Sequence, residues 1–234
     1  MHYCPICGKW CKNDIYNSSY AGYWFPSANT AEVPDQTIID EWETIPIPPA
    51  PELKSVAIDP ETCALLILDM ETSICQNPCC LATISKIYKL LTKARREGVL
   101  VVYSLTHSGS PLDIFRQLAP APNDPIVRSN VDKFYKTNLE KILQDHGVRT
   151  VVVTGYAANG AVLHTATSAA FRGYNAIVPV DCMSARNPYA EQYTAWHMLN
   201  SPGTRDRAVL TKVSLINFSP IEFSPSPGLF IGQY

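Results

Sequence analysis

The chain has 234 residues, of which 46% are hydrophobic, and its formal net charge at pH 7 is −2. This length suits one domain with an appendage, and the hydrophobic content is enough for a sizeable core. The small net charge gives no electrostatic basis for binding nucleic acid or an anionic membrane surface. No apolar run approaches the roughly 20 residues that cross a bilayer.

The N-terminal sequence Met1-His2-Tyr3-Cys4-Pro5 lacks the basic and then apolar pattern of a secretory signal, so we expect a cytoplasmic protein. The eight cysteines keep secretion open as the alternative, because an even number of cysteines in a secreted chain can form disulfides.

Residues 1–52 differ from the rest of the chain. They contain several cysteines and end near the proline-dense stretch 45–51. Proline at this density is incompatible with a helix interior or a central strand. The sequence therefore predicts an N-terminal arm over residues 1–52 and a folded domain over residues 53–234.

Cysteines at the start of this arm have the spacing of a metal-binding turn. Cys4, Cys7 and Cys11, together with His2, could supply the four ligands of a structural zinc ion. The spacing fits no standard zinc finger, and a disulfide or free thiols are the alternatives.

Beyond the arm, short apolar runs alternate with segments of helical periodicity that end near glycines. Strands that are buried on both faces and alternate with helices indicate a mainly parallel, Rossmann-like sheet in a three-layer α/β/α sandwich. The expected strands are 64–68, 99–105, 150–154, 176–180 and 209–216, and the expected helices are 81–96, 139–144, 159–172 and 190–199.

Three positions are expected at the carboxyl edge of this sheet. Asp69 directly follows the first strand, Arg128 lies in a loop segment, and Ala161 begins the helix after the third strand. In open α/β sheets this edge forms the ligand crevice. We therefore place the functional site here.

Several motifs around these positions occur in the order found in one family. The chain resembles the isochorismatase-like cysteine hydrolases over about residues 56–218. The segments that carry the resemblance are 65–70, 132–139, 155–166, 172–174 and 178–181.

The resemblance implies a catalytic triad of Asp, Lys and Cys, in which the aspartate activates the thiol for attack on a carbonyl. Carried over by position, the aspartate is Asp69, the lysine position holds Arg128, and the nucleophile position holds Ala161. The resemblance also implies a cis peptide bond at Tyr156–Ala157 and a homodimer or homotetramer. The Asp-x-His pair of metal-dependent relatives is absent, so no cofactor is expected for catalysis.

A methyl group cannot attack a carbonyl, so Ala161 excludes covalent cysteine chemistry at position 161. We expect a hydrolase that acts on a vinyl ether or a C–N bond of a small molecule, with Asp69 as acid or base and Arg128 as an electrostatic clamp. Two alternatives remain open. One is an inactive small-molecule-binding or scaffold protein; the other is a cysteine amidohydrolase whose nucleophilic cysteine has been replaced by alanine at position 161.

Further candidates surround the expected crevice. Cys75 could be a relocated nucleophile, a structural thiol, or a disulfide partner of Cys79 or Cys80. The remaining candidate substrate contacts are Glu71, His107, Tyr156, Ala157 and Asn159.

Overall fold

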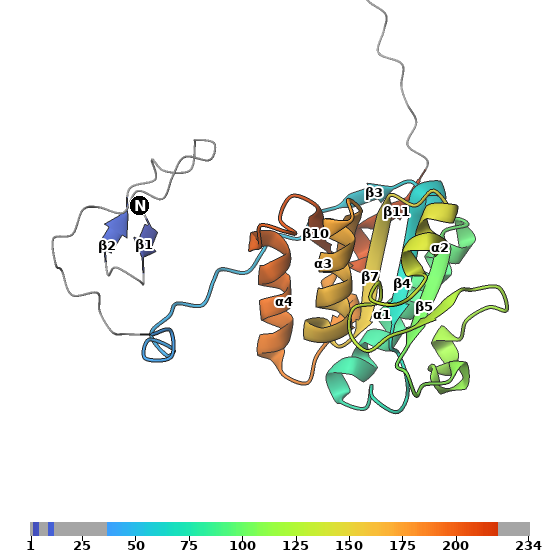
Figure 1. Ribbon diagram of the computed structural model, residues 1–234, viewed down its shortest axis with the longest axis horizontal. Helices are drawn as coiled ribbons and strands as arrows, with labels where there is room; N and C mark the ends of the chain where they lie inside the picture. The colour runs from blue at the N-terminus through green and yellow to red at the C-terminus, as the bar shows by residue number, and fades with distance from the viewer. Residues whose placement is uncertain (1, 5–8, 12–36, 220–234) are drawn as a thin grey trace, which may run out of the picture. The chain divides into compact units, whose positions relative to one another are not determined.

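The computed structural model describes residues 2–4, 9–11 and 37–219 (Figure 1). The chain divides into two compact units, Met1–Pro49 and Ala50–Tyr234, close to the boundary expected at residue 52. In the first unit, β1 (His2–Cys4) pairs antiparallel with β2 (Lys9–Cys11). Among the helices of the described segments, none has both the length and the apolarity to cross a membrane.

The second unit is built on a seven-stranded sheet whose strand pairs are all parallel. Its strands are β4 (Cys63–Leu68), β5 (Leu100–Leu105), β6 (Ile126–Arg128), β7 (Thr150–Tyr156), β8 (Asn175–Pro179), β9 (Met183–Ser184) and β10 (Ala208–Thr211). The spatial order is β10-β8-β7-β4-β5-β6, and β9 pairs with the end of β7. Every residue of β4 is buried, which explains its continuous apolar sequence.

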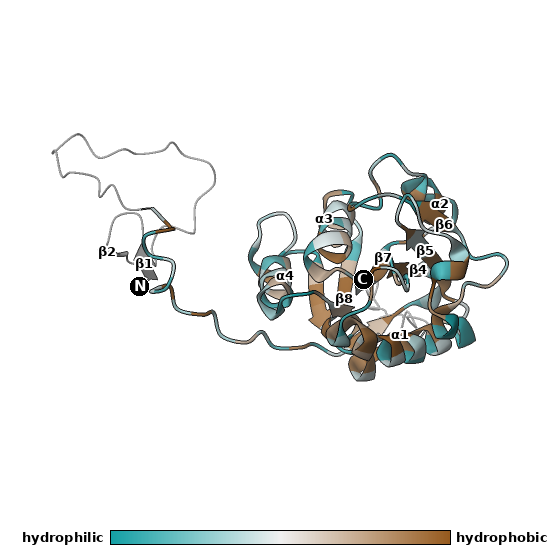
Figure 2. Cartoon of the chain, turned by 90° about the horizontal axis from the view of Figure 1, so that it is seen from below, coloured by the Kyte–Doolittle hydropathy of each residue, from teal (hydrophilic) through white to brown (hydrophobic). Residues whose placement is uncertain are grey.

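Helices cover both faces of this sheet. Figure 2 shows α1 (Pro78–Arg96) on one face, and α2 (Leu139–Asp145), α3 (Leu163–Phe171) and α4 (Pro188–Asn200) on the other. The buried residues form two hydrophobic clusters, one on each face of the sheet. The expected three-layer α/β/α architecture is thus confirmed.

Helix α1 begins at Pro78, before the start of the helix expected at 81–96, and a capping residue explains the earlier start. The Asn77 side chain accepts a hydrogen bond from the Cys80 N–H, and Pro78 follows it at the first helical turn. Ile84, Ile87 and Leu91 then recur at helical spacing and are buried against the sheet.

The structure also adds to the predicted elements. The expected strand at 209–216 is two strands, because residues 213–215 form a short 3-10 turn between β10 and β11 (Ile216–Phe218). Strand β11 pairs with β3 (Val56–Ile58), which the sequence did not predict. The edge strand β6 was also missed, since its three residues are too few to show a pattern.

The centre of the sheet depends on close contact between β4 and β7. Leu68 lies opposite Gly155 in the strand register, and Gly155 has a φ of 120°. A Cβ atom at position 155 would overlap the backbone carbonyl of Leu68. Only glycine fits here, both for its backbone conformation and for the space available.

We expect Gly155→Ala to lower the free energy of unfolding by more than about 2 kcal/mol, because it combines backbone strain with a clash against main-chain atoms. Gly98→Ala is the matched control, since Gly98 also has a positive φ (74°) but open space around its Cα. Urea denaturation of both variants measures the difference. Equal losses of stability would show that the contact with Leu68 is unimportant.

Candidate active site

Asp69 lies at the carboxyl edge of the sheet, directly after β4. The residue is almost fully buried (3% exposed), and its φ of 49° places it in the left-handed region, which is uncommon for a residue other than glycine. The Ser104 hydroxyl, at the neighbouring position on β5, donates a hydrogen bond of 2.7 Å to Asp69 Oδ1. The carboxylate is thereby fixed where the sheet ends.

Lys133 provides the positive partner of this carboxylate. Its ammonium Nζ lies 2.6 Å from Asp69 Oδ2, and the Lys133 side chain has no exposed surface. The same nitrogen donates to the backbone carbonyls of Ser129 (2.7 Å) and Asn130 (3.2 Å). All three donors of the ammonium group are therefore used, as a buried lysine requires.

The ion pair corrects the expected role of Arg128 as the electrostatic clamp on Asp69. Successive residues of β6 face opposite sides, so Val127 is buried and Arg128 is exposed. Lys133 reaches Asp69 from the segment that follows β6, where its backbone N–H is held by Thr165 Oγ1 on α3 at 3.1 Å. The only sequence signal for Lys133 was its place directly before Phe134 in a family motif.

The electrostatics of Asp69 combine opposing influences. Burial is the largest and raises the pKa of the carboxyl above its ordinary value, and the negative charge of Glu71 adds to the rise. The ammonium of Lys133 and the Ser104 hydroxyl lower the pKa but do not outweigh burial. Asp69 therefore keeps a proton to higher pH than an ordinary aspartate does.

The turn after β7 forms another side of the site. The Tyr156–Ala157 peptide bond is cis, as the resemblance implied, and residues 158–162 form a π-helical turn before α3. Ala161 is 4% exposed and belongs to the same buried cluster as Leu68 and Phe134, the chain neighbours of Asp69 and Lys133. The position that the resemblance assigns to the nucleophile thus lies just before α3, on the face of the sheet that α2, α3 and α4 cover.

The other candidate residues have separate environments. The Tyr156 hydroxyl accepts a hydrogen bond of 3.3 Å from the Asn77 side chain at the start of α1. His107 and Asn159 are exposed, and Ala157 is half-buried. Glu71 is fully buried and bonds to Thr106, so the expected contact between its side chain and substrate is not available in this conformation.

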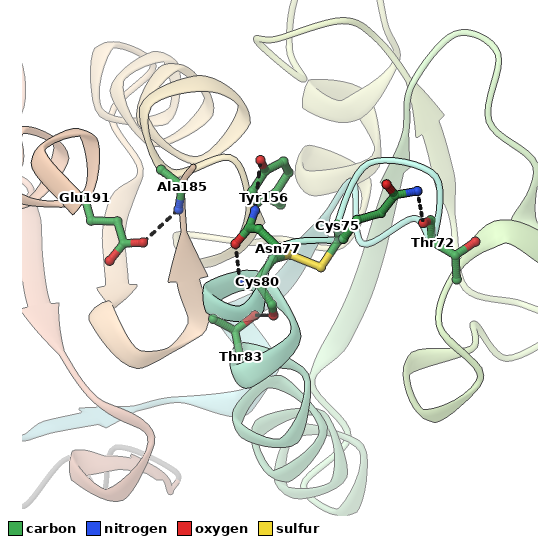
Figure 3. Close-up of a disulfide and its surroundings, with 9 residues drawn as sticks. Thr72, Cys75, Asn77, Cys80, Thr83, Tyr156, Ala185 and Glu191 are labelled. Carbon is green, nitrogen blue, oxygen red and sulfur yellow. Dashed lines mark hydrogen bonds between the residues drawn. A yellow bond between two sulfur atoms is a disulfide. The ribbon is translucent and has the colours of Figure 1, made fainter. Parts of the chain in front are cut away.

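Cys75 is not a relocated nucleophile in this structure, because it forms a disulfide with Cys80 (Figure 3). Both cysteines are fully buried, whereas the neighbouring Cys79 is exposed and free. The bridge joins the loop after Asp69 to the first turn of α1. It encloses Asn77, the residue that bonds Tyr156.

Metal ligands were expected only at the N-terminus. Cys7 lies outside the described residues, and the structure describes only the backbone of Cys4 and Cys11, so the zinc expectation stays a prediction. Elsewhere in the described part of the chain, no group of three or more His, Cys, Asp or Glu side chains could hold a metal ion.

Comparison with known proteins agrees with this geometry. The Isochorismatase domain family matches residues 63–206. The chain belongs to this family. The matched residues lie within the second unit, Ala50–Tyr234.

Individual relatives in the family cover different shares of the chain. The secreted isochorismatase effector Isc1 of Verticillium dahliae is 30% identical over 146 residues, which are 58% of this chain and 70% of that protein. The uncharacterized isochorismatase family protein YaaI of Bacillus subtilis is 32% identical over 89 residues, 38% of this chain and only 49% of that protein. The match to YaaI thus spans about half of its length.

Solved structures show the same isochorismatase-like fold. N-carbamoylsarcosine amidase of Thermoplasma acidophilum is 26% identical, with a TM-score of 0.55, over 65% of this chain and 96% of its own. A cysteine hydrolase of Pseudomonas syringae has a TM-score of 0.60 at 20% identity, over 70% of this chain and 95% of its own.

We expect Lys133→Met to destabilise the protein by about 3–5 kcal/mol at pH 7, because it leaves the buried carboxylate of Asp69 unpaired. The loss should shrink at acidic pH, where Asp69 is protonated in the folded variant and needs no counter-charge. Urea denaturation at both pH values measures this effect. Asp69→Asn combined with Lys133→Met should recover part of the loss, and Arg128→Met should change stability by less than about 0.5 kcal/mol. A larger effect of Arg128→Met than of Lys133→Met would contradict the assignment.

Replacing both Cys75 and Cys80 by alanine should lower the free energy of unfolding by about 2 kcal/mol, the entropic contribution expected for so short a loop. Cys79→Ala should leave stability nearly unchanged, since that thiol is exposed and unbonded. The midpoint of thermal unfolding, measured with and without a dithiol reductant, compares the wild-type protein with the double variant. Reduction should destabilise the wild-type protein and leave the double variant unaffected.

Proposed function

We propose that the protein hydrolyses a small molecule without a covalent cysteine intermediate, with Asp69 as the proton-transferring residue. The observation that carries this proposal is the buried Asp69–Lys133 ion pair at a sheet edge where position 161 is alanine. Two groups of the triad chemistry are present as a bonded pair, and only the nucleophile is missing. A hydrolase of this kind needs water as its nucleophile.

Cleavage of a vinyl ether suits these groups best. Protonated Asp69 gives its proton to the terminal alkene carbon, which leaves an oxocarbenium ion at the ether carbon. Water adds to that carbon and returns a proton to the Asp69 carboxylate, and the hemiketal then separates into a ketone and an alcohol. General acid catalysis of this kind needs a donor whose pKa lies near the working pH.

Lys133 has a defined part in that cycle. After Asp69 has released its proton, the carboxylate is negative in a buried site, and the ammonium 2.6 Å away stabilises it. Burial favours the protonated donor before transfer. The opposed influences on Asp69 therefore support both states of the cycle.

Hydrolysis of a C–N bond is the second candidate, and the names of relatives favour it. N-carbamoylsarcosine amidase of Arthrobacter is 32% identical over 88 residues, which are 37% of this chain and 33% of that protein. In this chemistry ionised Asp69 would act as a base on the attacking water. Arg128, exposed at the carboxyl end of β6, would attract an anionic substrate in either reaction.

The buried lysine also argues against an inactive scaffold. A fully buried ammonium carries a large desolvation penalty that an apolar side chain would avoid, so its presence favours a working site. Restoration of a cysteine amidase by Ala161→Cys, or a cysteine codon in the natural gene, would instead support the amidohydrolase alternative.

Asp69→Asn should lower turnover of isochorismate, or of a responsive member of a small amide panel, by at least about 100-fold, the usual contribution of a general acid or base. Asp145→Asn is the control, since Asp145 is an exposed carboxylate on α2 that pairs with Lys141. Activity measured as substrate consumption should remain at the wild-type level in this control. Wild-type activity in Asp69→Asn would exclude the catalytic role, and tight ligand binding without any turnover would support a binding protein.

The pH profile should separate the two reactions. A general acid works in its protonated form, so vinyl ether cleavage should decline as pH rises through the raised pKa of Asp69. A general base works in its ionised form, so C–N hydrolysis should increase over the same range. Initial rates across pH, with Asp69→Asn as the background, decide between them.

A further inference from the structure

Glu71 is a second buried carboxylate, two positions after Asp69 in the same loop. It has no exposed surface. Its Oε1 accepts a hydrogen bond of 2.6 Å from the Thr106 N–H, and its Oε2 accepts one of 3.0 Å from the Thr106 hydroxyl. Thr106 directly follows β5, so Glu71 connects the loop after β4 to the loop after the neighbouring strand.

Backbone contacts reinforce this connection. The Thr72 N–H donates to the Asp113 carbonyl (2.8 Å), and the Phe115 N–H donates to the Met70 carbonyl (3.2 Å). The Glu71 side chain also fills the space above Gly109, where a Cβ atom would overlap its carboxylate. Residues 106–115 are therefore fastened to the loop that carries Asp69.

The negative charge of Glu71 is not needed for these bonds. The amide of a glutamine could accept from the Thr106 N–H through its oxygen and donate to the Thr106 hydroxyl through its nitrogen. No ion pair within residues 37–219 includes Glu71. A buried charge without a cationic partner is unfavourable unless something else uses it.

We propose that Glu71 is a positioning residue that acts through Asp69: its carboxylate fastens residues 106–115 beside the site and places a second negative charge in the buried loop that carries Asp69. The electrostatic part stands without any assumed reaction, whereas its catalytic consequence rests on the function proposed above.

The other neighbours of Asp69 show why the charge of Glu71 matters for the ionisation of Asp69. Lys133 bonds Asp69 from the segment after β6, Ser104 bonds it from β5, and Glu71 lies two residues later in the loop of Asp69 itself. The first two favour the ionised carboxyl, so Glu71 is the only one of these three that opposes ionisation. Removal of the Glu71 charge should therefore lower the pKa of Asp69 and favour its ionised form.

Glu71→Gln tests the charge while keeping the shape and both bonds. We expect the titration midpoint of Asp69, followed by NMR of its side-chain carboxyl carbon and assigned with Asp69→Asn, to move to lower pH. Glu61→Gln is the control, because Glu61 is exposed at the opposite end of β4 and should leave the midpoint unchanged. Glu71→Asp keeps the charge and should restore a midpoint near that of the wild type.

The outcomes separate the inference from the proposed function. An unchanged Asp69 midpoint in Glu71→Gln overturns the inference. A lowered midpoint, with the pH limit of vinyl ether hydrolysis lowered in parallel, supports both proposals. A lowered midpoint with an unmoved limit of activity supports the role of Glu71 and excludes Asp69 as the acid.

Discussion

A lysine without exposed surface, bonded to an aspartate at the end of the central strand, sets the organisation of this domain. Neither group would be stable alone at such depth, so their surroundings must complete their hydrogen bonding. The hydroxyl of Ser104 donates a hydrogen bond to the carboxylate, and the carbonyls of Ser129 and Asn130 accept hydrogen bonds from the ammonium group. The hydrogen bonds that satisfy this one ion pair therefore also hold the loops at this edge of the sheet in place.

The layers of the fold and Asp69 could be predicted from the sequence because both depend on local patterns. The apolar run of β4 followed directly by Asp69 fixes a buried strand and its polar end. Lys133 could not be found in this way. Lysines are almost always exposed, and the contacts of Lys133, such as the bond from its backbone N–H to Thr165 on α3, join distant parts of the chain. Arg128 was chosen from motif position alone, which does not report the face of a short edge strand.

If position 161 is the nucleophile position, as proposed, alanine there also changes the acid–base properties of the site. In a site with a thiol, the aspartate and the thiol would exchange a proton, and their titrations would be coupled. Here the protonation of Asp69 is set by burial and by its fixed neighbours Lys133, Ser104 and Glu71. The pKa of Asp69 is therefore set by its fixed protein environment and not by a second group that exchanges a proton with it.

The contact between Gly155 and Leu68 separates the part of the site that cannot vary from the part that can. Position 155 has no room for any side chain, whereas Ala157 is half-buried and Asn159 is exposed only a few residues later. The fold therefore constrains where the turn begins more strongly than it constrains which side chains the turn presents. Diversification of the residues after the cis peptide bond, with Gly155 retained, offers a route to new substrate ranges on an intact scaffold.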